Sequence, residues 1–167
     1  MPVSPAAVKE LRELTGAGML DCKNALEEAD GDFEKAKDIL RAKGHAMAAK
    51  KAERATAEGL VQSYLHHDGR LGALVEVNCE SDFVARTADF GQLVQSVALQ
   101  VAATNPSYVS PEEMPEGAEG DPKELCLLLQ PFVRDESFTV EEMVKEAIRK
   151  TGENIRVRRF ARFELGR

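Results

Sequence analysis

With 167 residues, 43% of them hydrophobic and 31% charged, the chain has the composition of one ordinary domain or two small ones, and not of a disordered tail. Its net charge of −7 argues against a bulk nucleic-acid binder, and it has no apolar run of the ~18 residues that cross a membrane. Because its first residues lack the pattern of a signal peptide, we expect a cytoplasmic protein without a membrane partner.

Three short helices joined by glycine turns are predicted over residues 1–45. Ser4 is a favourable N-cap with proline at the next position, and apolar residues recur at helical spacing up to Thr15-Gly16-Ala17-Gly18. A second helix ends at Asp30-Gly31, and Asp32 caps a third. The first glycine run follows a helix and lacks the ending of a phosphate-binding loop, so we expect no nucleotide or other cofactor there.

Two apolar side chains, Met19 and Leu20, follow directly after this first turn. Residue type alone favours buried positions for both, because apolar residues are usually inside. A domain of about 45 residues has a marginal core, however, and would leave apolar side chains exposed only for a functional reason. The residues alone leave both interpretations open.

Residues 46–57 are predicted to form an exposed helical linker. The stretch is rich in alanine and lysine, and Met47 is its one large apolar side chain. Charge supports a boundary here, because residues 1–54 carry no net charge and the whole −7 falls on the remainder. A second domain therefore spans residues 58–167.

This second domain is predicted to be α+β, with a small antiparallel sheet packed by helices. Two strand-like runs, residues 59–67 and 71–79, flank Asp68-Gly69, which is a strong hairpin signal. Thr87 caps a helix whose apolar face needs a sheet to cover it.

A helix and a strand are predicted at the C-terminal end. Thr139-Val140-Glu141-Glu142 is a capping box, and Gly152 ends the helix that it starts. In the strand that follows, successive side chains point to opposite faces of the sheet, so its residues fall into two sets. The face expected to turn to the core carries Ile155, Val157, Ala161, Phe163 and Leu165.

Residues 105–123 hold four prolines and several carboxylates, so we expect a mobile loop that is too polar to pack.

The widely spaced Cys22, Cys79 and Cys126 are odd in number, which suits neither a disulfide framework nor a zinc site. We expect reduced, buried thiols and no metal.

The loop between the predicted strand 71–79 and the next helix carries an acidic residue beside an aromatic one, Asp82 and Phe83. Loops display their side chains, which makes this pair a candidate functional tip. From residue types alone, the commoner arrangement is that Asp82 caps the following helix and Phe83 packs beneath it.

Four segments of the chain are distinctive when taken together. The two longest are residues 11–26 (LRELTGAGMLDCKNAL) and 76–85 (EVNCESDFVA). The other two are Gln130-Pro131-Phe132-Val133 and 158–164 (RRFARFE), so the four extend over nearly the whole chain. Together they resemble the elongation factor Ts family, the guanine-nucleotide exchange factors of elongation factor Tu.

The resemblance implies a UBA-like N-terminal domain that docks on elongation factor Tu, and a core that places its tip beside the magnesium site of that partner. It implies an exchange factor without covalent chemistry, which binds both GDP-bound and nucleotide-free Tu. The magnesium-dislocating stretch falls on Ser81, Asp82, Phe83 and Val84, with Ser81 where threonine is usual. The N-terminal contacts fall on Arg12, Met19 and Leu20, the last in place of a common methionine.

The chain looks like a short member of the family. Longer members have a second core subdomain and a helical segment before the Gln-Pro-Phe-Val motif, whereas this chain leads almost directly into Gln130. Short members pair two copies, so a homodimer is expected. The apolar residues Leu125 and 127–129 are then either core or interface.

RNA binding is the main alternative, because arginines beside aromatics can stack bases. The last strand interleaves such residues: Arg156, Arg158, Arg159, Phe160, Arg162 and Phe163. The acidic domain and the lack of RNP-type glycines favour a solvated strand face instead, without direct nucleic-acid contact. Binding of ubiquitin-like folds by the first domain, and an enzyme site at His66 and His67, are weaker alternatives, since the histidines lack metal-ligand spacing.

Overall fold

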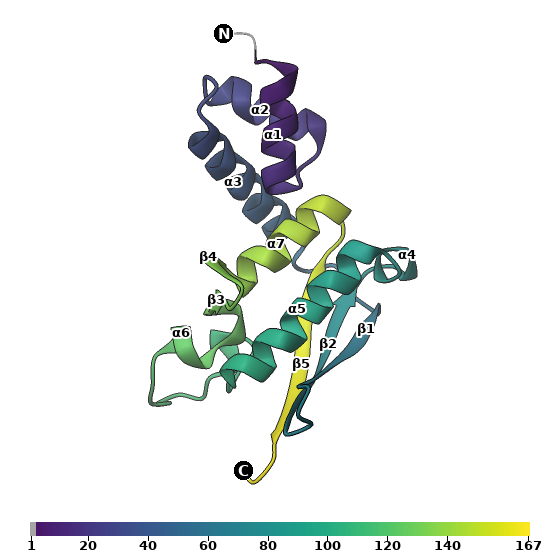
Figure 1. The fold of residues 1–167 in the computed structure, drawn as a ribbon, viewed down its shortest axis with the longest axis vertical. Helices are drawn as coiled ribbons and strands as arrows, with labels where there is room; N and C mark the ends of the chain where they lie inside the picture. The colour runs from purple at the N-terminus through teal and green to yellow at the C-terminus, as the bar shows by residue number, and fades with distance from the viewer. Residues whose placement is uncertain (1–2) are drawn as a thin grey trace.

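The computed structural model describes residues 3–167 and shows an elongated molecule with only helices at its N-terminal end and a sheet packed by further helices at the other (Figure 1). Met1 and Pro2, which the predicted first domain includes, lie outside the described residues. Within residues 3–167, no helix is long and apolar enough to cross a membrane. The mixed helices and antiparallel sheets confirm the predicted α+β class.

The N-terminal end contains three helices, α1 (Pro5–Thr15), α2 (Met19–Glu28) and α3 (Phe33–Lys51). Their caps are the predicted ones, because the side chain of Ser4 accepts from the amide of Ala7 and that of Asp32 accepts from two amides of α3. Gly16, at φ 66°, ends α1 in the left-handed conformation that glycine adopts without strain. A separate cluster of buried side chains, centred on Leu11 and Leu26, holds the three helices together.

Helix α3 continues to Lys51, through the first half of the stretch predicted as a linker. Its C-terminal half packs along α7 (Val140–Thr151), where Gly44 faces the backbone of Lys145 and the side chain of Arg149. Ala48 is buried in the cluster of the second half of the chain. This part of α3 is therefore packed rather than fully exposed, and the domain boundary at residues 46–57 stays a prediction.

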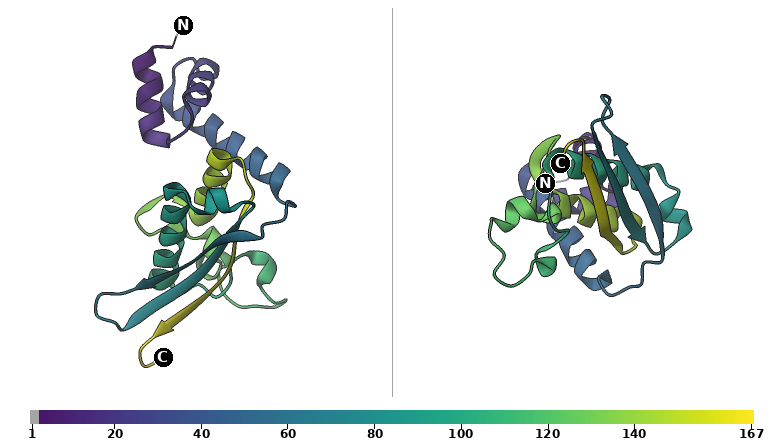
Figure 2. Two further views of the ribbon diagram at one scale, coloured as in Figure 1. Left: turned by 90° about the vertical axis from the view of Figure 1, so that its right-hand side faces the viewer. Right: turned by 90° about the horizontal axis from the view of Figure 1, so that it is seen from below.

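The larger sheet has the order β1-β2-β5 and is antiparallel throughout. Its strands are β1 (Glu58–Leu65), β2 (Leu71–Cys79) and β5 (Ile155–Glu164). The predicted hairpin at Asp68-Gly69 joins β1 and β2. Helix α5 (Ala88–Thr104), capped by Thr87 as predicted, packs against one face of this sheet, and α7 packs against α5 and β5 (Figures 1 and 2).

The remaining elements are short. They are α4 (Asp82–Ala85), η1 (Pro111–Glu113), α6 (Pro122–Leu125), η2 (Leu127–Leu129) and the two strands of a small hairpin, β3 (Pro131–Phe132) and β4 (Asp135–Thr139). The predicted capping box at Thr139 and Glu142 starts α7, and Gly152 ends it. All three cysteines are free and buried, as predicted.

The predicted faces of β5 are wrong beyond Val157. The register shifts where Val77 pairs with Val157 and Glu76 pairs with Arg159, so one extra residue stands on β5. A bulge of this kind reverses the alternation that follows it. Phe160 consequently packs against the core, whereas Phe163 is 77% exposed on the other face.

The loop at 105–123 is partly packed, contrary to the expectation. Pro106 and Val109 are buried, and backbone hydrogen bonds join residues 107–109 to residues 125–128. The mobility of the remainder stays a prediction. Of the apolar residues whose place was left open, Leu127 is fully buried and Leu128 packs against the core.

Candidate partner-binding site

The predicted tip, residues 81–84, projects from the end of β2 as the start of the short helix α4 (Figure 1). Phe83 is 85% exposed, and the carboxylate of Asp82 pairs with Arg86 over 3.1 Å at the surface. The arrangement favoured by residue type, with Asp82 as the cap and Phe83 beneath the helix, is therefore wrong. The aromatic ring points away from its own core.

Ser81, and not Asp82, caps α4. Its hydroxyl oxygen accepts from the amide of Val84 over 3.3 Å. The same hydroxyl donates to Oε2 of Glu153 over 2.6 Å, and the Ser81 amide donates to Oε1 of Glu153 over 3.0 Å. The sequence did not indicate Glu153 as a site residue. It shows only that Glu153 follows Gly152, which ends the helix, whereas the contact with Ser81 joins residues 72 positions apart.

The buried thiol of Cys79 supports the tip from below. It donates to the carbonyl oxygen of Ser81 over 3.1 Å. Burial raises the pKa of Cys79, and the negative charge of Glu153 raises it further. The thiol therefore stays protonated at neutral pH, as its donor role requires.

The second set of candidate residues lies on the N-terminal helices. Met19 is 50% and Leu20 69% exposed on the first turn of α2, and Arg12 is exposed on α1. The buried positions that residue type favours for Met19 and Leu20 are wrong. Both apolar side chains are left at the surface.

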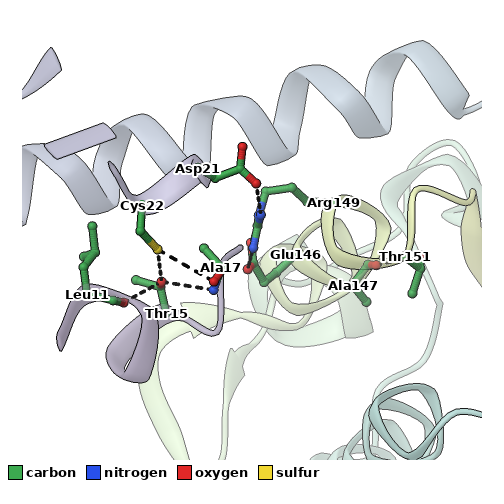
Figure 3. Close-up of polar contacts among 9 residues, drawn as sticks. All are labelled: Leu11, Thr15, Ala17, Asp21, Cys22, Glu146, Ala147, Arg149 and Thr151. Carbon is green, nitrogen blue, oxygen red and sulfur yellow. Dashed lines mark hydrogen bonds and ion pairs between the residues drawn. The ribbon is translucent and has the colours of Figure 1, made fainter. Parts of the chain in front are cut away.

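The turn between α1 and α2 is held by its own side chains (Figure 3). The hydroxyl of Thr15 donates to the carbonyl oxygen of Leu11 over 2.7 Å and accepts from the amide of Ala17 over 3.2 Å. The thiol of Cys22 lies 3.9 Å from the same hydroxyl. These contacts fix where α2, with Met19 and Leu20, begins.

Arg149 joins α2 to α7 (Figure 3). Its side chain is only 5% exposed and forms ion pairs with Asp21 over 3.4 Å and with Glu146 over 2.6 Å. The hydrogen bonds that Arg149 donates to Glu146 raise the pKa of Arg149, so the guanidinium stays charged. The tip is thus held by Glu153, directly after α7, and α2 is held by Arg149, at the C-terminal end of α7.

Three of the four arginines of the RNA-binding alternative have partners within the chain, although the side chains of Arg158 and Arg159 remain largely exposed. Arg158 and Arg159 pair with Glu76 over 3.4 and 2.6 Å. The side chain of Arg162 is 14% exposed and donates to the carbonyl oxygen of Ala102. In residues 3–167, no group of three or more His, Cys, Asp or Glu side chains could hold a metal ion.

Comparisons with known proteins show which family the chain belongs to. Residues 21–121 match the family model described as Elongation factor TS. The elongation factor Ts of Caldanaerobacter subterraneus subsp. tengcongensis is 51% identical, over 98% of this chain and 97% of that protein. The chain belongs to the elongation factor Ts family. The resemblance inferred from the sequence is confirmed, and membership makes the chain a translation elongation factor.

Other members match over similar spans. The elongation factor Ts of Heliobacterium modesticaldum is 50% identical, over 98% of this chain and 90% of that protein. That of Fervidobacterium nodosum is 47% identical, over 99% of this chain and 100% of that protein. The match therefore covers essentially all of the chain.

This chain lacks residues that its relatives have. The alignment with the Caldanaerobacter relative runs over 194 positions, at least 27 more than the 167 residues of the chain. The family-model match ends at residue 121, at the start of α6. The resemblance to longer family members implies that a helical segment is absent from the same region, before Gln130.

Proposed function

We propose that the chain is the guanine-nucleotide exchange factor of elongation factor Tu: it binds the GDP-bound partner, perturbs its magnesium site and promotes release of GDP so that GTP can bind. The observation that carries the proposal is the 85% exposure of Phe83 on a capped turn, in a chain of the elongation factor Ts family. An apolar ring left in water by its own fold is typical of a side chain that a partner covers.

The tip would act by displacement. Magnesium keeps a near-octahedral shell with few protein ligands, so a small movement of those ligands removes charge neutralisation from the bound diphosphate. The ring of Phe83 is a rigid wedge with two rotatable bonds. The carboxylate of Asp82 would compete for donors around the metal. Neither side chain needs to form or break a covalent bond.

The N-terminal surface supplies a second contact. We propose that Arg12, Met19 and Leu20 dock on the GTP-binding domain of Tu. An acceleration of about ten thousandfold requires ~5.5 kcal/mol of differential interaction, which is more than one exposed pair of side chains supplies. Both surfaces therefore have to contribute.

A homodimer is supported by the outer face of the β1-β2-β5 sheet. Val61, Leu65 and Leu74 are exposed there, and Phe163 lies beside them across Gly72. Contiguous exposed apolar side chains on a sheet face are typical of an interface. We propose that a second copy covers this face, and that the dimer acts in the cytoplasm.

Release of fluorescent GDP from elongation factor Tu, with and without the chain, tests the proposal. We expect faster release with the chain at saturation. By linkage, GDP must weaken the affinity of Tu for the chain by the same factor by which the chain weakens the affinity for GDP. An unchanged release rate together with GDP-independent binding would refute the exchange function.

A further inference from the structure

A carboxylate outside the tip holds the tip in place. The two oxygens of Glu153 each accept one hydrogen bond from Ser81, from its amide over 3.0 Å and from its hydroxyl over 2.6 Å. Hydrogen bonds to an ionised acceptor are stronger than neutral ones. The two residues are 72 positions apart, so this contact joins two separate loops.

A neighbouring residue in each loop, Glu80 before Ser81 and Asn154 after Glu153, repeats the contact in the opposite direction. The amide of Asn154 donates to Oε1 of Glu80 over 2.7 Å. The side chain of Asn154 is buried and donates to the carbonyl oxygen of Arg54 over 2.8 Å. Residues 80–81 and 153–154 thus exchange amide-to-carboxylate hydrogen bonds, which fixes one loop against the other.

Besides Glu153, the tip is held by the Cys79 thiol, which donates to Ser81, and by Val84, which packs against the core. Helix α4 has only four residues, far fewer than an isolated helix needs for stability. Phe83 is too exposed to contribute packing, and Ala85 is the one buried residue of α4. The hydroxyl that caps the amide of Val84 is the same one that Glu153 orients.

Glu153 itself is held firmly. It follows Gly152, whose left-handed φ of 72° ends α7, and its amide donates to the hydroxyl of Thr151 over 3.3 Å. One turn earlier on α7, Arg149 pairs with Asp21 of α2. The tip and the helix that carries Met19 and Leu20 are therefore both positioned by residues 149–153.

We propose that Glu153 is a positioning residue for nucleotide exchange: it fixes Ser81 and, through Ser81, the direction in which Phe83 projects. The inference rests on the exchange function proposed above. Glu153 acts before the partner arrives, because an ordered tip has less conformational entropy to lose on insertion. Its loss reduces the fraction of complexes in which the ring reaches the magnesium site.

Two variants of the full chain test this role in GDP release from elongation factor Tu. Glu153→Ala removes both acceptors, and Glu153→Gln keeps the shape and one acceptor. Glu141→Gln, at the other end of α7, is the control with the same change of charge. The measured quantities are the maximal release rate at saturating chain, the concentration that gives half this rate, and the hydrogen exchange of the Val84 amide in the free chain.

We expect the maximal rate to fall at least about tenfold for Glu153→Ala and less for Glu153→Gln, with the control unchanged. The half-saturating concentration should stay within about threefold, because the N-terminal contacts are intact. The Val84 amide should exchange faster in Glu153→Ala. A general loss of folding would instead appear as lower thermal stability with both kinetic parameters affected.

A Glu153→Gln chain that stays folded and matches the wild-type maximal rate and Val84 exchange would overturn the positioning role. A rise in half-saturating concentration with an unchanged maximal rate would overturn it as well. In both outcomes the wild-type chain still accelerates GDP release, so the proposed exchange function would stand. A wild-type chain that fails to accelerate release refutes the exchange function itself, and with it this role.

Discussion

The guanidinium of Arg149, on α7, lies 3.4 Å from the carboxylate of Asp21, on α2, and this ion pair ties the N-terminal helices to the rest of the chain. The Arg149 side chain is almost completely buried, and Glu146 holds it from the same helix. Met19 and Leu20 lie one turn or less from Asp21. The pair therefore helps to determine where the N-terminal contact residues stand relative to the tip.

Replacing Arg149 with alanine should lower stability. The change removes two ion pairs and leaves Glu146 without its partner. Because Asp21 is half exposed and water screens part of the interaction, we expect a loss of about 1–2 kcal/mol in the free energy of unfolding. Urea denaturation measures it, with the exposed Lys9→Ala as control. Equal midpoints for the two variants would contradict this role.

Gly16 should not tolerate alanine. Its φ is 66°, in the left-handed region, whereas the nearest atom to an added Cβ, Nζ of Lys150 at 2.5 Å, ends a flexible side chain that can move away. The backbone conformation alone costs about 1 kcal/mol for a residue with a Cβ. Gly91→Ala is the matched control, because this helical glycine has no atom within 4 Å of the added carbon. We expect a lower urea midpoint for the first variant and an equal or higher one for the second; the reverse order would refute the explanation.

Phe163→Glu should separate the proposed dimer. The ring is 77% exposed on the outer sheet face, so a carboxylate there leaves the fold of the single chain intact. In the proposed dimer, the same carboxylate would be buried without a partner against the second copy. Sedimentation velocity should give a monomer for Phe163→Glu and a dimer for the wild type. The control is Leu20→Glu, at a similarly exposed position on α2. A dimer that survives Phe163→Glu would place the interface elsewhere.

Leu20→Glu should weaken docking on elongation factor Tu. Its side chain is 69% exposed, so the charge costs little in the free chain but is desolvated in the complex. In the GDP-release assay, the half-saturating concentration should rise at least about tenfold. The maximal rate should change less, because the tip is untouched. An unchanged half-saturating concentration would remove Leu20 from the interface.

Local signals predicted much of this fold. Ser4, Thr87 and Thr139 cap the helices that they were expected to cap, and Gly152 ends α7, because each signal depends on residues within one helical turn. The hairpin at Asp68-Gly69 is of the same kind. Structural roles that depend only on residues a few positions away can be predicted from the sequence.

Contacts across long separations could not be predicted in this way. The bulge on β5 depends on its pairing with β2, and it reversed the expected faces of Phe160 and Phe163. The hydrogen bonds between Ser81 and Glu153 depend on how two loops meet. For the tip, residue type favoured a buried ring, and only the family resemblance indicated the exposed one that the structure has.

The maximal rate of GDP release from elongation factor Tu, with wild-type chain and with Phe83→Ala at saturation, tests the central claim most directly. Val133→Ala, a substitution of another exposed apolar side chain, is the control. We predict strong acceleration by the wild type and the control, and a rate at least about tenfold lower with Phe83→Ala. Equal maximal rates for all three chains would contradict the account, because release would then not depend on the exposed ring.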